Sequence, residues 1–139
     1  MMNPNISIAD LNATNKDTLM ESLGIEYTEV GVDYLCAKMP VDNRTFQPMG
    51  LLHGGANVAL AETIGSIGSH ITIDDTTHYV VCSNINASHI KSAKNGYVYG
   101  KGTIVHFGRS THVWSVEIKD EKGNLLSVSR LTMMVIEKK

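Results

Sequence analysis

The feature that most constrains the fold is a long apolar helix, predicted over about Gly55 to Ile71. Its large side chains recur every three or four residues, so at about 100° per residue they gather on one side. This stripe consists of Leu60, Ile64, Ile67 and Ile71. We expect the stripe to lie against a β-sheet, because a helix face of this kind has to be buried against another element.

Segments typical of β-strands flank the helix, two before it and four after it. The stretch IEYTEVGVDYLCAKMPV predicts a hairpin that turns at GVD, and the loop NRTFQPMG then leads into the helix. The later strands are predicted in YVVCSNINASHI, YVYGKGTIVHFG, THVWSVEIKD and LLSVSRLTMMVIE. Turn-like residues separate them, and EKGN between the last two is a hairpin signal. The predicted fold class is α+β, with one antiparallel sheet wrapped around one central helix.

The N-terminal residues 1–23 are predicted to be a helical extension. Asp17 is the expected cap of a short helix over TLMESLG, and Gly24 is its expected end. The chain has 139 residues and contains no internal repeat, low-complexity tract or linker. We therefore expect residues 1–139 to form a single domain.

Composition and charge argue against several kinds of partner. A formal net charge of −2 gives no reason to expect DNA or RNA binding. The longest apolar stretch, Val58 to Ile73, is interrupted by Glu62 and by small residues, so we expect no membrane span. The N-terminus lacks the cationic start and apolar run of a secretory signal. We expect a cytoplasmic protein in which Cys36 and Cys82 are buried, reduced thiols.

Glu62 is the only carboxylate in the run from Phe46 to His70, and it is either an ordinary surface acid or part of a site. A solvated helix face would normally carry further charges four residues away, but Val58 and Ser66 occupy those positions. The side of the helix that holds Glu62 consists of small residues: Gly55, Val58, Ala59, Gly65, Ser66 and Ser69. We expect another subunit or a ligand to approach this side and to desolvate Glu62 in part.

The tripeptide HGG, which begins the helix, supplies a second chemical group. The amides of Gly54 and Gly55 belong to the first turn, where N–H groups have no partner within the helix. The absence of side chains lets a ligand approach, and the helix dipole favours negative charge there. These amides could stabilise the oxyanion formed when an acyl group is attacked, and Glu62 could supply the attacking or proton-accepting carboxylate.

Three long segments together resemble a known family. PVDNRTFQPMGLLHGGANVALAETIGSIGS, NINASHIKSAKNGYVYG and GRSTHVWSVEIKDEKGNLLSVSRLT are similar to the hotdog-fold acyl-CoA thioesterases that carry a glutamate on the central helix. Within that family the likeness is greatest to bacterial enzymes that hydrolyse 1,4-dihydroxy-2-naphthoyl-CoA and related aryl thioesters such as 4-hydroxybenzoyl-CoA. The resemblance runs from about Gly24 to Ile136.

The resemblance implies roles for individual residues. The catalytic carboxylate would be Glu62 and the oxyanion donor Gly54, with His53, the active-site glutamine Gln47 and the helix hydroxyl Ser66 beside them. The CoA-binding residues would be His89, Ile90, Lys91, Ser92, Phe107, Gly108, Arg109, Ser110 and Thr111. Lys91, Lys94 and Arg109 are placed to meet phosphates, although each could equally be a solvated turn cation. Related sequences often have arginine at position 91, where Lys91 offers a point charge instead of a bidentate fork.

The same resemblance implies an assembly and a reaction. The active site would lie between two subunits of a homodimer, which often pairs into a homotetramer. The reaction would be hydrolysis of an aryl- or small acyl-CoA thioester, without a cofactor beyond the CoA of the substrate. Glu62 would either attack the carbonyl to form an anhydride or act as general base on a water. If the acyl group is dihydroxynaphthoyl, the pathway would be menaquinone biosynthesis.

Three alternatives compete with hydrolysis. A hotdog enoyl-CoA hydratase would need an aspartate near the helix entrance ahead of His53, and none is present. A non-catalytic acyl-CoA-binding protein could share the fold, but the joint presence of Gln47, His53, Gly54 and Glu62 argues against it. A metal site is not expected, because the six histidines are scattered without the spacing that zinc requires.

Overall fold

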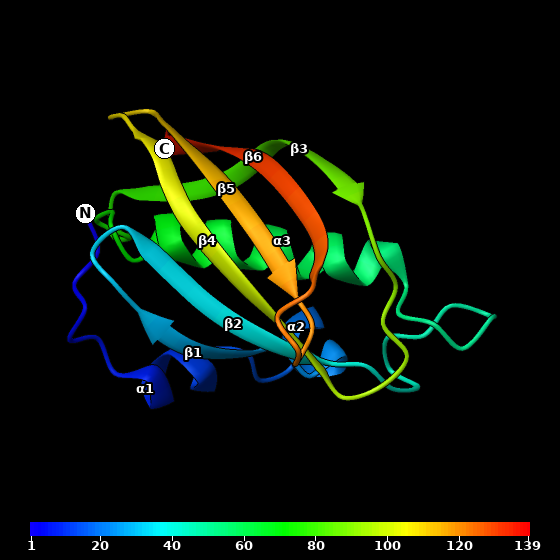
Figure 1. Cartoon of the computed structure of the whole chain (residues 1–139). Helices are drawn as coiled ribbons and strands as arrows, with labels where there is room; N and C mark the ends of the chain where they lie inside the picture. The colour runs from blue at the N-terminus through cyan, green and yellow to red at the C-terminus, as the bar shows by residue number, and fades with distance from the viewer.

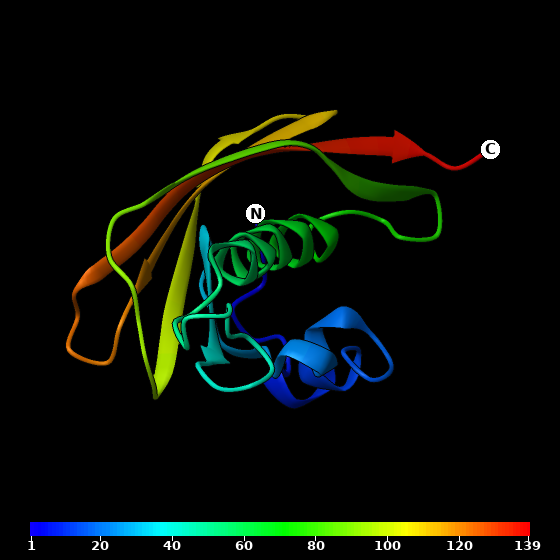
Figure 2. The same cartoon turned by 90° about the vertical axis from the view of Figure 1, so that its right-hand side faces the viewer.

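A six-stranded antiparallel sheet curves around one long helix, and this helix lies in the concave face of the sheet (Figures 1 and 2). The computed structural model describes all 139 residues. The strand order is β1-β2-β4-β5-β6-β3. The elements are α1 (Ile8–Ala13), α2 (Leu19–Leu23), β1 (Glu26–Val30), β2 (Tyr34–Pro40), α3 (Gly54–His70), β3 (His78–His89), β4 (Tyr97–Phe107), β5 (Thr111–Lys119) and β6 (Leu125–Glu137). The predicted α+β fold, with two strands before the helix and four after it, is confirmed.

The face of α3 that meets the sheet differs in part from the predicted apolar stripe. Leu60 and Ile64 are fully buried as expected, but Ile67 and Ile71 are only half-buried. Gly65 and Gly68 face the sheet instead, because β5 and β6 lie too close to α3 there to leave room for a side chain on the helix. A Cβ at Gly65 would lie 2.3 Å from Leu131, and one at Gly68 would lie 2.4 Å from Trp114. The prediction that Gly65 and Ser69 share an open face with Glu62 is therefore wrong.

Ser69 fixes the C-terminal end of α3 to the sheet through a buried polar contact. Its hydroxyl accepts a hydrogen bond from Nε1 of Trp114 at 2.9 Å and lies 2.9 Å from Nδ1 of His112. The His112 ring also stacks on Phe107, with 4.5 Å between the ring centroids. Burial lowers the pKa of His112 below its usual value of 6.5. The fold therefore favours the neutral imidazole at this position.

This contact predicts a loss of stability in mild acid. An unfolded chain takes up a proton on His112 near pH 6.5, whereas the folded chain resists it. The contribution of neutral His112 is complete above about pH 6.5 and declines as the pH falls from there toward its lowered folded pKa. Urea unfolding from pH 8 to pH 5 measures it. His112→Asn, which cannot titrate, should show a flatter pH dependence, and a dependence equal to that of the wild type would contradict the assignment.

The two edges of the sheet differ in whether another part of the chain covers them. At the β1 edge, Asn12 of α1 accepts a hydrogen bond from the N–H of Tyr27 and donates one to its carbonyl, at 2.7 and 3.1 Å. The N-terminal helices therefore occupy pairing groups of this edge. At the opposite edge β3 runs for 12 residues beside β6 alone, with exposed apolar side chains such as Tyr79 and Val81. A long open edge of this kind is a template for pairing with another chain.

Two local predictions need correction, and others are confirmed. The N-cap of α2 is Thr18 and not Asp17, whose backbone has a φ of 61°, while Gly24 ends the helix in the left-handed conformation as expected. Cys36 and Cys82 are free thiols, but they are half-buried instead of buried, and desolvation raises the pKa of both. None of the helices has the length and apolar character that a membrane crossing would require.

Candidate active site

A tightly closed loop between β2 and α3 holds the predicted Gln47. The N–H of Gln47 donates to the carbonyl of Leu51 at 2.8 Å, and the N–H of Gly50, whose φ is 75°, donates to the carbonyl of Gln47. The side-chain oxygen of Gln47 accepts a short hydrogen bond from the N–H of Met49. Because this bond occupies the oxygen, the Gln47 amide presents its NH₂ group as a donor.

His53 is the N-cap residue of α3, and its contact with the first turn sets its tautomer. Its Nδ1 accepts a hydrogen bond from the N–H of Gly55 at 2.7 Å, as a side-chain N-cap does. A neutral imidazole that accepts at Nδ1 carries its proton on Nε2, so the exposed edge of His53 is a donor. The N–H of Gly55 is consumed by this contact. Of the two amides expected to meet an oxyanion, only that of Gly54 keeps a first-turn N–H without a hydrogen-bond acceptor in the chain.

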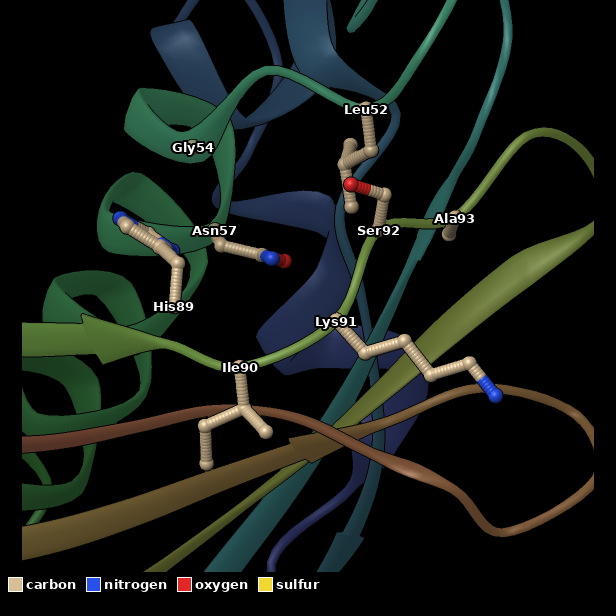
Figure 3. Close-up of a pocket in the computed structure, with 8 residues that line it drawn as sticks. All are labelled: Leu52, Gly54, Asn57, His89, Ile90, Lys91, Ser92 and Ala93. Carbon is tan, nitrogen blue, oxygen red and sulfur yellow. The ribbon is translucent and has the colours of Figure 1, made fainter.

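Gly54 opens into a hollow that contains the first group of predicted CoA-binding residues (Figure 3). The hollow has a volume of about 340 Å³. It is lined by Leu52, Gly54, Asn57, His89, Ile90, Lys91, Ser92 and Ala93. The ring of His89 covers Gly54 so closely that a Cβ there would lie 3.0 Å from Nε2 of His89. The structure therefore brings the expected oxyanion donor together with residues 89–92.

Glu62 lies in a separate hollow of about 330 Å³, between α3 and α2. Its lining residues are Leu19, Met20, Ala59, Glu62, Thr63, Ser66 and Ile67. Ser66, predicted beside the reacting group, shares this hollow with Glu62. The Glu62 side chain is exposed in the single chain. Glu62 is therefore not desolvated in the single chain. The expected partial desolvation requires a second subunit or a ligand to cover the carboxylate.

Gly54 and Glu62 are too far apart to act on the same carbonyl from one chain. They stand eight residues apart on α3, which corresponds to about 12 Å along a helix that rises about 1.5 Å per residue. A thioester carbonyl spans only one bond, so its oxygen and its carbon cannot meet both groups across this distance. Within one chain, Gly54 and Glu62 therefore line two separate hollows.

The second group of predicted CoA-binding residues, Phe107 to Thr111, lies at the other end of the helix. This turn closes through the N–H of Gly108, which donates to Thr111 at 2.9 Å, and Ser110 accepts from Val135. It contacts the C-terminal end of α3 through His112 and Ser69. Within one chain, this turn and residues 89–92 therefore lie apart and do not form a common binding site. Arg109 and Lys94 are both exposed, and neither forms an ion pair.

Several residues that line the two hollows were not identified from the sequence, among them Asn57, Leu19 and Met20. Asn57 is 4% exposed and lines the hollow at Gly54. The sequence signal that could have identified Asn57 is an amide side chain on the buried side of an apolar helix. Leu19 and Met20 form the wall opposite Glu62, and no local pattern reveals a contact between α2 and α3. No group of three or more His, Cys, Asp or Glu side chains lies close enough together to hold a metal ion.

Comparison with known proteins assigns the family. A family model described as "Thioesterase superfamily" matches residues 49–127. The 1,4-dihydroxy-2-naphthoyl-CoA hydrolase of Escherichia coli is 44% identical over 131 residues, which cover 94% of this chain and 96% of that protein. A mutant thioesterase from Pseudomonas aeruginosa has a crystal structure with a TM-score of 0.95 and 37% identity, and the match covers 99% of each chain.

A Staphylococcus aureus thioesterase provides two further structures. Their TM-scores are 0.84 and 0.82 at 39% identity, with 86% and 84% of this chain and 99% and 97% of that protein covered. One structure carries a glutamate-to-alanine change and the other a glutamine-to-alanine change, at positions fifteen residues apart. The family model matches more than half of this chain, and the relatives span most of it. The chain belongs to the thioesterase superfamily and is a thioester hydrolase with the hotdog fold.

Proposed function

We propose that this protein hydrolyses compact aromatic acyl-CoA thioesters at a site shared between two copies of the chain. The observation that carries the proposal is the separation of Gly54 and Glu62 into two hollows, about 12 Å apart along one helix. Each hollow contains half of the groups that acyl transfer needs. A second copy can supply the missing half to each of them.

The open β3 edge suggests how two copies would meet. Two β3 strands paired antiparallel about a two-fold axis would continue the sheet from one subunit into the next. Because α3 packs against β3, the same axis would set the two central helices side by side and antiparallel. The partner subunit's Glu62 would then face Gly54, and its turn at residues 107–111 would approach residues 89–92. The exposed carboxylate of Glu62 would become covered in this assembly.

The chemistry follows from groups on the two chains. The N–H of Gly54 and Nε2–H of His53 would donate to the thioester oxygen and stabilise the developing oxyanion. Glu62 would either add to the carbonyl carbon, giving an anhydride that water then hydrolyses to the free acid, or remove a proton from a water that attacks the carbonyl itself. On either path the carbon–sulfur bond would break and release the CoA thiolate, which takes up a proton. The NH₂ group of Gln47 would orient the water or the carboxylate. These steps use no cofactor, because the CoA belongs to the substrate.

A spacing shared with a relative supports two of these roles. Gln47 and Glu62 stand fifteen positions apart. The glutamine and glutamate replaced in the two Staphylococcus aureus structures have the same separation. A glutamine was also replaced in the Pseudomonas aeruginosa enzyme. This agreement in residue type and spacing favours Gln47 and Glu62 as the reacting pair.

The hollow beside Glu62 favours a small acyl group. Its volume of about 330 Å³ and its wall of Leu19, Met20 and Ile67 suit an aromatic ring system better than a long flexible chain. Thr63 and Ser66 add hydroxyl groups that could bind ring substituents. The Escherichia coli relative named as a dihydroxynaphthoyl-CoA hydrolase is consistent with this class.

A thiol-release assay over a panel of acyl-CoA substrates tests the proposal. We expect kcat/KM for benzoyl- and 1,4-dihydroxy-2-naphthoyl-CoA to exceed that for palmitoyl-CoA by about 100-fold or more, since a poorly fitting chain forfeits several methylene contacts. A preference for long saturated chains would contradict the acyl class. CoA binding without release of thiol from any substrate would instead indicate the non-catalytic alternative.

A further inference from the structure

Asn57 has a buried side chain without a hydrogen-bond partner. The residue is 4% exposed, and its Oδ1 has no partner in the chain. Figure 3 shows the amide projecting from α3 across the hollow toward the Ile90–Ser92 stretch. Buried amides are nearly always hydrogen-bonded, because burying one without a partner costs free energy. The unpaired Oδ1 therefore favours an occupant of the hollow that can pair with an amide.

No backbone group around the hollow forms a hydrogen bond with Oδ1 of Asn57. The N–H groups of Ile90 and Lys91 both donate to the carbonyl of Leu126, at 2.7 and 3.3 Å. The carbonyl of Ala93 accepts from Leu52 at 2.9 Å. These contacts tie the loop to β6 and to the segment before α3, so these three backbone groups already have partners. In this structure the chain itself supplies no partner for Oδ1 of Asn57.

The chemistry of the hollow points to a secondary amide on an alkyl chain. An asparagine side chain offers one acceptor and two donors, which match the N–H and C=O of such an amide. Leu52, Ile90 and Ala93 supply apolar walls for methylene groups. Asn57 lies one helical turn beyond Gly54, about 4.5 Å along the axis. In an acyl-CoA, an ethylene link joins the thioester sulfur to the first amide of the pantetheine arm, which is a comparable separation.

We propose that Asn57 binds the amide of the pantetheine arm nearest the thioester and thereby sets the carbonyl on the Gly54 N–H. This assignment rests on the proposed function, because it takes an acyl-CoA as the substrate. Asn57 makes the reaction depend on a part of the substrate that does not react. Thioesters that lack the amide lose this contact and should be hydrolysed poorly for that reason alone.

The test compares substrates with and without the amide. Benzoyl-CoA and the benzoyl thioester of N-acetylcysteamine carry it, whereas S-propyl thiobenzoate does not. Asn57→Leu, which keeps the shape and removes the polar group, should lower kcat/KM for the first two by about 10- to 100-fold and leave S-propyl thiobenzoate unchanged. Asn57→Ala should show the same selectivity if the leucine variant folds poorly. Asn5→Leu makes the same chemical change on the exposed N-terminal segment and should leave kcat/KM for all three thioesters unchanged.

Binding of CoA itself separates this proposal from the proposed function. Calorimetric titration should show CoA binding about tenfold weaker to Asn57→Leu than to the wild type, whether or not any thioester is hydrolysed. A wild type that binds CoA but releases no thiol would refute the hydrolase mechanism and leave this result decisive for Asn57. Equal losses on all three substrates, unchanged CoA binding, or dissociation of the assembly in both variants would overturn the role of Asn57 in binding the substrate.

Discussion

Replacing Glu62 by Gln is expected to lower kcat for acyl-CoA hydrolysis by about 10³-fold, with folding and assembly unchanged. Glutamine keeps the size of the side chain but can neither attack a carbonyl nor accept a proton. The structure gives Glu62 no other task, because its side chain is exposed and forms no ion pair. The loss should therefore fall on catalysis alone. Hydrolysis rates on benzoyl-CoA measure the loss of catalysis. Thermal unfolding and the mass of the assembly in solution check that folding and assembly are unchanged.

Glu117→Gln is the matched control for this experiment. Glu117 is an exposed carboxylate on β5, 3.9 Å from Lys119, and such surface pairs contribute little to stability. It should retain full activity. Near-normal hydrolysis by Glu62→Gln would remove the carboxylate from the mechanism. In single-turnover hydrolysis by the wild type in ¹⁸O-labelled water, label that enters the Glu62 carboxylate identifies an anhydride intermediate, because general-base catalysis cannot place label there.

Gly54→Pro is expected to reduce kcat by about 10²- to 10³-fold, because it removes the N–H that would stabilise the oxyanion. Proline is tolerated at the first position of a helix, where the N–H has no intrahelical acceptor. The preceding residue, His53, has φ −66° and ψ 129°, a conformation that proline also permits. The substitution should therefore preserve the fold while deleting one donor. Steady-state kinetics and far-UV circular dichroism check the two halves of this prediction.

Gly54→Ala isolates the N–H from the effect of added bulk. A Cβ at position 54 would lie 3.0 Å from Nε2 of His89, and both variants add one. Alanine keeps the backbone N–H, whereas proline removes it. The His89 side chain is exposed and can move aside, so the alanine variant should lose much less activity. Equal losses in the two variants would assign the effect to crowding at His89 and would remove the Gly54 amide from the oxyanion site.

The secondary structure could be predicted from the sequence because its signals are local. The hairpin turn at EKGN forms as predicted, with Gly123 at φ 82° and Asp120 accepting from it. The start of α3 follows from the glycines and from His53, which caps the helix. The face of α3 could not be predicted in full, because Trp114 and Leu131 come from distant strands. They fill the space beside Gly65 and Gly68 and leave Ile67 and Ile71 at the margin.

The candidate residues could be chosen from the sequence one by one, but their positions within one chain depend on the fold. Glu62 and Gly54 stood out through their chemistry and their closeness in the sequence. On a helix that closeness becomes a separation of about 12 Å, and the two residues line different hollows. Likewise, residues 89–92 and 107–111 lie at opposite ends of α3 in one chain. The contacts of Leu19 and Met20 beside Glu62 depend on tertiary packing, which no local pattern encodes.

The measurement that tests the shared site most directly is the activity of mixed dimers. Gly54→Pro and Glu62→Gln chains, each expected to be nearly inactive alone, would be unfolded and refolded together at equal concentration. In a mixed dimer one site pairs the intact Gly54 of one chain with the intact Glu62 of the other. Half of the dimers would be mixed and each would hold one working site of two, so we expect about a quarter of wild-type activity. If both residues acted within one chain, mixing would restore nothing, and activity no higher than that of either variant alone would contradict the account.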